Sequence, residues 1–310
     1  MSQVFVGVDG GGTTVRAVVV DAAGIELGRA RGPGAVLLLS DPEGAVEATA
    51  SVVRDALRAA GISGPADVLW AGLAGAGRSE AQEAGRVGLR RKGLANRVVV
   101  GTDVQAAFSD AFRGGAGILA IAGTGSIIWG RDSEGQMHRV GGWGAALGDE
   151  GGGYWVGSQA LRLLLRMHDG RASRSEPYVR ALCEALSIET PDAAVPWIET
   201  ADKAAVAALV PVVRRAAESG DAAAGDLLDV AAGALVEQIE AMLRCSAVWP
   251  SPIPLALWGG LVAEADGALH PRLLARLPEG LHLLTRSIDP PMGAAQRALR
   301  LKDAADGSPG

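Results

Sequence analysis

The sequence has few cysteines, no excess of positive charge and no long apolar run, and each absence excludes a class of protein. Its only cysteines, Cys183 and Cys245, form no CxxC or Cys/His cluster, so we predict no structural zinc site and a reducing compartment. The net charge of −6 argues against a general nucleic-acid binder, because phosphate backbones are held by excess Lys and Arg. No apolar run reaches the ~18 residues of a membrane span, and no basic segment opens the chain. We therefore expect a cytoplasmic protein.

Two common phosphate-binding motifs are also missing. The Walker A pattern G-x-x-x-x-G-K-[ST] does not occur. The first glycine cluster leads into a second apolar run rather than a helix, which fits dinucleotide-binding folds poorly. The four histidines have no spacing typical of a metal site or a catalytic triad. Any phosphate chemistry must therefore use another arrangement.

The chain opens with a pattern typical of an antiparallel β-meander. Val4 to Val8 and Val15 to Val20 are apolar runs rich in β-branched residues, and a glycine-rich turn separates them. A second turn, Asp21 to Gly24, leads to a third predicted strand, Ile25 to Ala30.

The same pattern recurs in the middle of the chain. Ile118 to Ala122 and Ile127 to Trp129 are apolar and flank the turn Gly123-Thr124-Gly125-Ser126. Asp132 to Gly135 then repeats the D-x-x-G turn, and Met137 to Val140 stands where the third strand stood. We interpret this as a duplicated unit that opens each of two lobes, and a chain of 310 residues suits two lobes. Chance similarity of two glycine-turn hairpins is the alternative.

Helices and further strands fill the remaining sequence. Apolar spacing, Pro and Gly predict helices over 41–61, 79–91, 104–112, 154–167, most of 201–247, and 291–301, and strands over 68–73, 97–100, 253–258 and 281–285. The mixture predicts an α/β protein.

The first glycine turn carries the residues that phosphate binding requires. Glycine backbone can approach a phosphate closely, and the hydroxyls of Thr13 and Thr14 add donors. Asp9, at the end of the preceding strand, is placed to hold Mg²⁺ directly or through water. An ordinary hairpin turn is the alternative. The second turn favours phosphate binding, since a phosphoryl group in transfer needs donors on several sides.

Asp103 lies between a predicted strand and a predicted helix. A kinase that acts on a hydroxyl needs such a carboxylate to orient the acceptor and accept its proton. The alternative is a helix N-cap, although an N-cap at Asp103 would have no acidic residue or Gln at N3 to complete a capping box. The sequence leaves both roles open.

Two glycine tracts follow the second turn. Residues 141–153 place Trp143, Asp149 and Glu150 in an irregular loop, where carboxylates could bind sugar hydroxyls and an indole could stack on a sugar ring. A flexible connector is the alternative. Gly259-Gly260 follows a strand and would let the backbone approach a flat ring or a phosphate, or it forms a simple turn.

Five segments together resemble the N-acetylglucosamine kinase branch of the BadF/BadG/BcrA/BcrD ATPase family, within the actin, Hsp70 and sugar-kinase superfamily. They are VGVDGGGTTVRAVV, IAGTGSIIWG, GGWGAALGDEGGGYWVG, LALWGGL and DPPMGAA, and the resemblance spans about residues 3 to 302. It implies a two-lobed actin-like ATPase (ribonuclease H-like) fold with duplicated β-meander-plus-helices domains around a nucleotide cleft. The expected lobes are residues 1–113 with a closing helix at 288–302, and residues 114–287, followed by a disordered tail at 303–310.

The resemblance also implies an ATP- and Mg²⁺-dependent kinase that phosphorylates N-acetylglucosamine or glucosamine, with the 6-hydroxyl as the expected acceptor, and a homodimer. Asp103 would be the catalytic base and would contact the substrate, and Asp9 would hold the metal. Gly142, Trp143 and Asp149 would line the sugar pocket. ATP would contact Asp9, Gly11, Gly12, Thr13, Thr14, Gly123, Thr124, Gly125, Ser126, Gly259 and Gly260. Lobe closure would exclude water.

One departure concerns the choice of sugar. Relatives that phosphorylate N-acetylglucosamine usually carry an Asn in the loop after the third strand, and here that loop, Gly32 to Leu37, has none. Gly152 also replaces a usual Ser. Two other functions compete: an ATPase that activates 2-hydroxyacyl-CoA dehydratases or benzoyl-CoA reductases, and a non-catalytic nucleotide sensor. The first uses bridging cysteines, and Cys183 and Cys245 are not in comparable positions.

Overall fold

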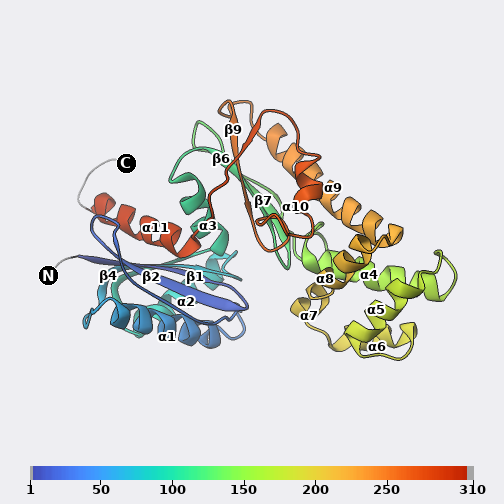
Figure 1. The fold of residues 1–310 in the computed structure, drawn as a ribbon. Helices are drawn as coiled ribbons and strands as arrows, with labels where there is room; N and C mark the ends of the chain where they lie inside the picture. The colour runs from blue at the N-terminus through green and yellow to red at the C-terminus, as the bar shows by residue number, and fades with distance from the viewer. Residues whose placement is uncertain (1–2, 306–310) are drawn as a thin grey trace. The chain divides into compact units, whose positions relative to one another are not determined.

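The computed structural model describes residues 3–305, which fold as two compact units (Figure 1). The first unit contains the chain up to Gly114 together with the segment from Ser287 onward, and the second runs from Gly115 to Arg286. Within the described residues, no helix is both long enough and apolar enough to cross a membrane.

The first unit is built on a five-stranded mixed sheet with the order β3-β2-β1-β4-β5. The strands β1, β2 and β3 are antiparallel neighbours, whereas β4 runs parallel to β1 and β5 parallel to β4. This arrangement confirms the predicted meander. The bounds are β1 (Val4–Gly10), β2 (Thr14–Asp21), β3 (Glu26–Pro33), β4 (Ala66–Leu73) and β5 (Ala95–Gly101).

Helices cover both faces of this sheet (Figure 1). Alternation along β1 separates the two cores: Val6 and Val8 pack with α1 (Glu43–Ala59) and α2 (Ser79–Arg91), while Phe5 packs with α11 (Pro290–Ala305) near α3 (Asp103–Phe112). At Gly7 a Cβ atom would lie 2.1 Å from the backbone nitrogen of Ala295. Only glycine therefore allows α11 to pack directly on the backbone of β1.

The closing helix is longer than the sequence indicated. It continues past Lys302 to Ala305, because no glycine or proline interrupts the chain before Gly307. The predicted disordered tail therefore cannot begin at 303, and residues 306–310 lie outside the described part of the chain.

The second unit repeats the same strand order. Its sheet has the order β8-β7-β6-β9-β10. The strands β8, β7 and β6 are antiparallel neighbours, whereas β9 runs parallel to β6 and β10 parallel to β9. Chance similarity of two hairpins would not reproduce all five positions, so the topology confirms the predicted duplication. The bounds are β6 (Gly117–Ala122), β7 (Ser126–Arg131), β8 (Met137–Gly141), β9 (Ile253–Trp258) and β10 (Leu281–Leu283).

The second unit has a larger helical layer than the first. Ile118 and Ile128 of the sheet join a core with Leu164, Leu228 and Ile239 of the long helices. The stretch 176–200, where the sequence pattern predicted no helix, forms two of the helices. The helices are α4 (Gly153–His168), α5 (Glu176–Leu186), α6 (Ala194–Thr200), α7 (Lys203–Ala207), α8 (Val210–Glu218), α9 (Ala222–Arg244) and α10 (His270–Leu274), with a 3₁₀ turn at Pro191–Ala193.

Candidate functional site

The carboxyl ends of three parallel strands meet at one edge of the first unit's sheet. Gly10 at the end of β1 lies opposite Leu73 of β4, and Gly72 of β4 lies opposite Gly101 of β5. Ligands of open α/β sheets bind outside this kind of edge. The topology therefore brings together Asp9 and Asp103, which the sequence separates by more than ninety positions.

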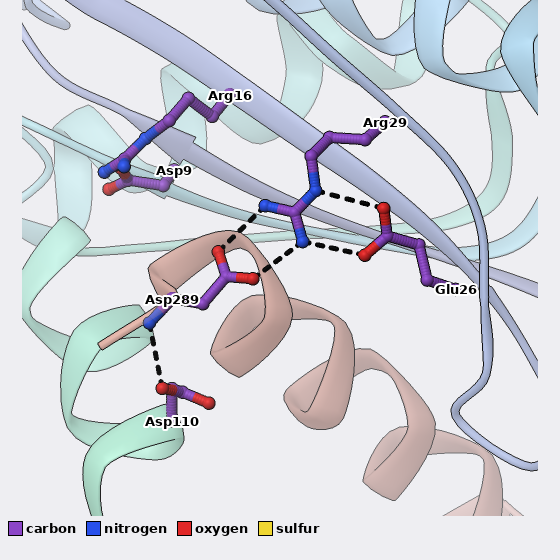
Figure 2. A network of polar contacts seen from close by, with 6 residues as sticks. All are labelled: Asp9, Arg16, Glu26, Arg29, Asp110 and Asp289. Atoms are coloured by element: carbon purple, nitrogen blue, oxygen red, sulfur yellow. Dashed lines mark hydrogen bonds and ion pairs between the residues drawn. The ribbon is translucent and has the colours of Figure 1, made fainter. Parts of the chain in front are cut away.

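Asp9 is buried and forms an ion pair across the strands. Its side chain is on β1 opposite Arg16 on β2, and Arg16 Nη2 and Nε lie 2.5 and 3.2 Å from Asp9 Oδ2 (Figure 2). Asp9 Oδ1 has no hydrogen-bond partner among the described residues. One carboxylate oxygen thus remains available to a ligand.

Burial raises the pKa of Asp9 to about 6. The Arg16 guanidinium opposes this shift, whereas the nearby charges of Asp103 and Asp289 add to it. A bound cation would stabilise the ionised form of Asp9 against both burial and these neighbouring negative charges.

The turn after β1 has the backbone donors expected of an anion site. Gly11 N–H donates to the Thr14 carbonyl at 2.9 Å, which closes the turn. The N–H groups of Gly12 and Thr13 donate to no residue in the described part of the chain. Both residues are exposed. These two N–H groups are therefore accessible to an anion.

Asp103 is the first residue of α3 rather than its N-cap. Thr102 is the cap: its hydroxyl accepts from Gln105 N–H at 3.2 Å, and the Gln105 side chain accepts from Thr102 N–H at 3.0 Å. The alternative that Asp103 is the N-cap is therefore wrong, because the cap is the preceding residue. The Thr-x-x-Gln pattern of a capping box, Thr102 to Gln105, indicates this cap in the sequence. Asp103 Oδ1 accepts from Val104 N–H at 3.0 Å. Burial raises the pKa of this carboxyl, and the hydrogen bonds from the backbone of Val104 and Asp103 oppose that shift.

A polar network fixes the start of α11 beside these groups (Figure 2). Asp289 N–H donates to Asp110 Oδ2 at 2.9 Å, and the Asp289 carboxylate pairs with both terminal nitrogens of Arg29 at 3.0 and 2.6 Å. Glu26 holds the same guanidinium from β3. The network connects β3, α3 and α11, so it anchors the C-terminal segment to the first unit. Sequence motifs did not single out Arg29 or Arg16.

The second glycine turn, in the second unit, also leaves backbone donors unused. Gly123 N–H donates to the Gly125 carbonyl at 2.9 Å, whereas the N–H groups of Thr124 and Gly125 donate to none of the described residues. Ser126 differs from the rest of the turn because it is buried and its hydroxyl donates to the Glu150 carbonyl at 2.7 Å. Its side chain holds the 141–153 tract in place.

The 141–153 tract lies against this turn. Asp149 has a φ of +60°, an orientation that Asp tolerates better than most residues, and its Oδ1 accepts from Gly144 N–H at 3.0 Å. Its Oδ2 lies 2.5 Å from where a Cβ of Gly125 would be, and burial raises the pKa of this carboxyl. Asp149 is therefore beside the second turn as well as in the predicted sugar loop.

Trp143 is strongly exposed for an indole. It keeps 71% of its surface, and the Arg139 guanidinium lies 4.6 Å from its ring centroid. Arg139 also donates to the carbonyls of Gly141 and Gly142, at 3.1 and 2.7 Å. One face of the indole is thus occupied by a cation whose own position is fixed.

Gly259 and Gly260 reach the same edge from β9. Gly259 has a φ of +103°, and a Cβ there would lie 2.3 Å from the Ala122 carbonyl oxygen. Leu261 N–H donates to that oxygen at 3.1 Å. Gly260 faces open space, with nothing within 4 Å of its Cβ position.

A cavity of about 730 Å³ lies between Gly260 and the second glycine turn. Its size is within the range of small-molecule sites. Arg214 connects two of its walls, because it donates to Glu218 on α8 at 2.7 Å and to the carbonyl of Asp266. The lining is Gly123, Thr124, Gly153, Ala207, Ala208, Val210, Pro211, Arg214, Arg215, Glu218, Gly260, Leu261, Asp266 and Ala268.

This lining combines an apolar wall with a few charged groups. The α7 and α8 wall was missed from the sequence because an Ala/Val-rich helix carries no signal of a ligand. Two other cavities of the second unit, one between α4 and α9 and one beside α5, contain none of the predicted site residues.

Comparisons with known proteins agree with this architecture. The chain is 28% identical to an N-acetyl-D-glucosamine kinase of Dictyostelium discoideum, over 97% of this chain and 99% of that one. It is 30% identical to an N-acetylmuramic acid/N-acetylglucosamine kinase of Clostridium acetobutylicum, over 62% of this chain and 63% of that enzyme. It thus aligns with slightly less than two thirds of the Clostridium enzyme.

A solved structure from Chromobacterium violaceum, of a protein proposed to be an N-acetylglucosamine kinase, superposes with a TM-score of 0.77 at 29% identity. The match covers 96% of this chain and 99% of that one. The predicted two-lobed, actin-like α/β fold is thereby confirmed. The sequence model of the BadF/BadG/BcrA/BcrD ATPase family matches residues 6–270. The chain belongs to the BadF/BadG/BcrA/BcrD ATPase family.

Proposed function

We propose that this protein is an ATP-dependent kinase that transfers the γ-phosphate to a hydroxyl of an amino sugar, N-acetylglucosamine or glucosamine. The observation that carries the proposal is at the first unit's sheet edge, where Asp103, which is not a helix cap, lies near a turn with two unused N–H donors. Full-length relatives named as N-acetylglucosamine kinases support the choice of acceptor.

Each glycine turn offers donors that could bind phosphate. The N–H groups of Gly12 and Thr13, and those of Thr124 and Gly125, are unused donors suited to phosphate oxygens. The cavity beside Gly260 would receive the adenosine, since its wall is largely apolar and its volume suits a base with its ribose. Gly11, Thr14, Gly123, Ser126 and Gly259 would shape these surfaces.

Magnesium would be held at Asp9. The described residues contain no group of three His, Cys, Asp or Glu side chains able to hold a metal alone. Mg²⁺ in kinases is usually bound by one or two carboxylates together with phosphate oxygens and water, so the single unused oxygen of Asp9 fits. When bound, the ion would neutralise charge on the phosphates.

Asp103 would act as the base. Its carboxylate would orient the acceptor hydroxyl, proposed to be the 6-hydroxyl, and take its proton as the oxygen attacks phosphorus. In the second unit, Trp143 offers one exposed face to a sugar ring, and Gly142 and Asp149 are proposed to contact the sugar as well. We also propose that the enzyme acts in the cytoplasm and as a homodimer.

A screen of ADP release tests the proposal. Purified protein with ATP and Mg²⁺ is assayed with N-acetylglucosamine, glucosamine, N-acetylmannosamine, glucose and N-acetylmuramic acid. We expect an amino sugar to stimulate ADP release well above the rate without sugar. If no sugar does so, the kinase assignment fails.

A further inference from the structure

One buried amide side chain contacts the 141–153 tract. Gln238 lies on α9 with 9% of its surface exposed, and its Nε2 donates to the Glu150 carbonyl at 3.0 Å. The same carbonyl accepts from the Ser126 hydroxyl at 2.7 Å. A carbonyl oxygen has two lone pairs, so both acceptor positions are used. The peptide group between Glu150 and Gly151 is therefore held in one orientation by two side chains.

The backbone at both ends of the tract packs directly on α9. A Cβ at Gly141 would lie 2.2 Å from Gln238 Oε1, and a Cβ at Gly151 would lie 2.7 Å from the Ala231 carbonyl oxygen. Both glycines have positive φ, +70° and +79°, which is a conformation that favours glycine. Gln238 thus lies against the start of the tract and is hydrogen-bonded near its end.

Packing alone does not account for an amide at this position. Gln238 Oε1 is buried and has no hydrogen-bond partner among the described residues. A buried acceptor without a partner destabilises the folded state, and a hydrocarbon side chain of similar size would avoid that cost. The Nε2 donor to Glu150 is the feature that a hydrocarbon could not supply.

The second glycine turn has anchors of its own. The first two residues of α4, Gly153 and Tyr154, donate their N–H groups to carbonyls of this turn at 2.8 Å. Neither bond involves the Glu150 carbonyl. Loss of the Gln238 amide should therefore loosen the 141–153 tract more than the turn.

We infer that Gln238 is a positioning residue for the sugar acceptor, because its amide fixes the Glu150 carbonyl and with it the backbone that presents Trp143 and Asp149. The inference rests on the proposed function, in which Trp143 and Asp149 contact the sugar. It goes further by assigning the geometry of those contacts to a residue of α9 that acts through the tract and not on the sugar itself.

Gln238→Met tests the inference, since methionine keeps the length of the side chain and removes the amide. We expect kcat/KM for the amino sugar to fall about tenfold, the loss of roughly one buried hydrogen bond, while the KM for ATP stays within about twofold of wild type. Amide hydrogen exchange within 141–153, followed by mass spectrometry, should become faster.

Met242→Ala is the matched control. Met242 is buried on the same helix, and its sulfur lies 2.6 Å from where a Cβ of Gly130 in β7 would be. The variant should therefore lower stability through lost packing on β7, with wild-type exchange in the tract and a wild-type kcat/KM for the sugar.

Gln238→Glu separates the hydrogen bond from packing. A buried carboxyl is protonated at low pH and can then donate to the Glu150 carbonyl, whereas the ionised form cannot. Values are taken relative to wild type at each pH, because Asp149 titrates in both proteins. Relative kcat/KM for the sugar should be near one at about pH 5.5 and fall about tenfold by about pH 8.5, and Gln238→Met should show no such change.

The outcomes distinguish this inference from the proposed function. Wild-type kcat/KM for the sugar in folded Gln238→Met, or equal losses for sugar and ATP, would overturn the inference alone. If Gln238→Met does not fold, a ratio for Gln238→Glu that is independent of pH would overturn it instead. No turnover of any amino sugar by the wild-type enzyme would overturn both.

Discussion

The two units share one strand order, yet they differ at the strand ends beside their glycine turns. In the first unit, Gly10 and Val15 form the cross-strand pair next to the turn, and Asp9 and Arg16 form the following pair. At the corresponding step in the second unit the pair is Ile121 and Ile127. The same scaffold therefore carries an ion pair between buried Asp9 and partly exposed Arg16 in one copy, and hydrocarbon in the other.

This difference assigns different tasks to the two copies. The first unit gathers the carboxylates Asp9 and Asp103, which suit cation binding and proton transfer. The second unit has the 730 Å³ cavity beside Gly260, which suits a nucleoside. Both copies keep a glycine turn with two unused N–H donors, and different side chains surround it in each copy.

The largest expected effect comes from removing the base. Asp103→Asn should lower kcat by about 10²- to 10⁴-fold, the usual contribution of a general base. ATP affinity should stay close to wild type, since the nucleoside cavity is in the other unit. Steady-state kinetics and calorimetric titration with ATP measure the two quantities, with Asp55→Asn on the surface of α1 as the control. Wild-type kcat in Asp103→Asn would remove the base assignment.

Burial of the Asp9 carboxylate in the first unit should cost stability near neutral pH. Burial raises the pKa of Asp9 to about 6, compared with 3.8 for the unfolded chain. Between pH 3.8 and about pH 6 the native state therefore binds more protons than the unfolded state. Stability should therefore fall as pH rises from about 4 to 6. Asp9→Asn should escape this loss and be more stable than wild type at pH 7 by about 1–3 kcal/mol, while losing activity.

Urea unfolding of both proteins at pH 4 and pH 7 measures the difference. Ile121→Val in the second unit is the control, because its effect on stability should not depend on pH in this range. If Asp9→Asn is less stable than wild type at pH 7, the attraction of Arg16 outweighs the cost of burial, and the expected gain in stability is wrong in sign.

In the second unit, the two adjacent glycines should respond in opposite ways. Gly260→Val adds a side chain in open space beside the cavity, so the fold should survive while the Kd for ATP rises about tenfold or more, the cost of roughly 1.4 kcal/mol. Gly259→Val instead forces a Cβ onto the Ala122 carbonyl at a φ of +103° and should lower the melting temperature. Unchanged ATP affinity in a folded Gly260→Val would place the nucleoside elsewhere.

The smallest effect concerns the cap that positions Asp103. Thr102→Ala should cost about 1 kcal/mol of stability and lower kcat a fewfold, because Asp103 follows the cap directly. Asp221→Ala removes the cap of α9, where Asp221 accepts from Ala224 N–H at 2.9 Å, and should cost stability without changing kcat. Equal effects of the two variants on kcat would show that Thr102 acts only on stability.

Local patterns were enough to predict the repeated part of this molecule. The apolar runs on either side of the glycine turns, and the D-x-x-G turns that follow, identify three strands of each sheet because their causes lie within a few residues. Asp9 and the two turns followed from the same signals.

Features that depend on long-range packing were not predicted. Arg16 faces Asp9 only because the turn between them has a particular length, and Arg29 meets Asp289 only because α11 returns to the first unit. The α7 and α8 wall of the cavity is formed by ordinary Ala and Val positions. The capping box at Thr102 could have been read from the sequence by shifting the start of α3 by one residue.

The proposed kinase activity requires that ATP turnover by this protein phosphorylates a sugar. Wild-type protein incubated with ATP, Mg²⁺ and N-acetylglucosamine can be analysed for sugar phosphate by mass spectrometry and for ADP by chromatography in the same sample. We expect one sugar phosphate for each ADP, and about 10²- to 10⁴-fold slower formation of both products in Asp103→Asn. ADP formed without sugar phosphate would contradict it and indicate an ATPase that drives another process.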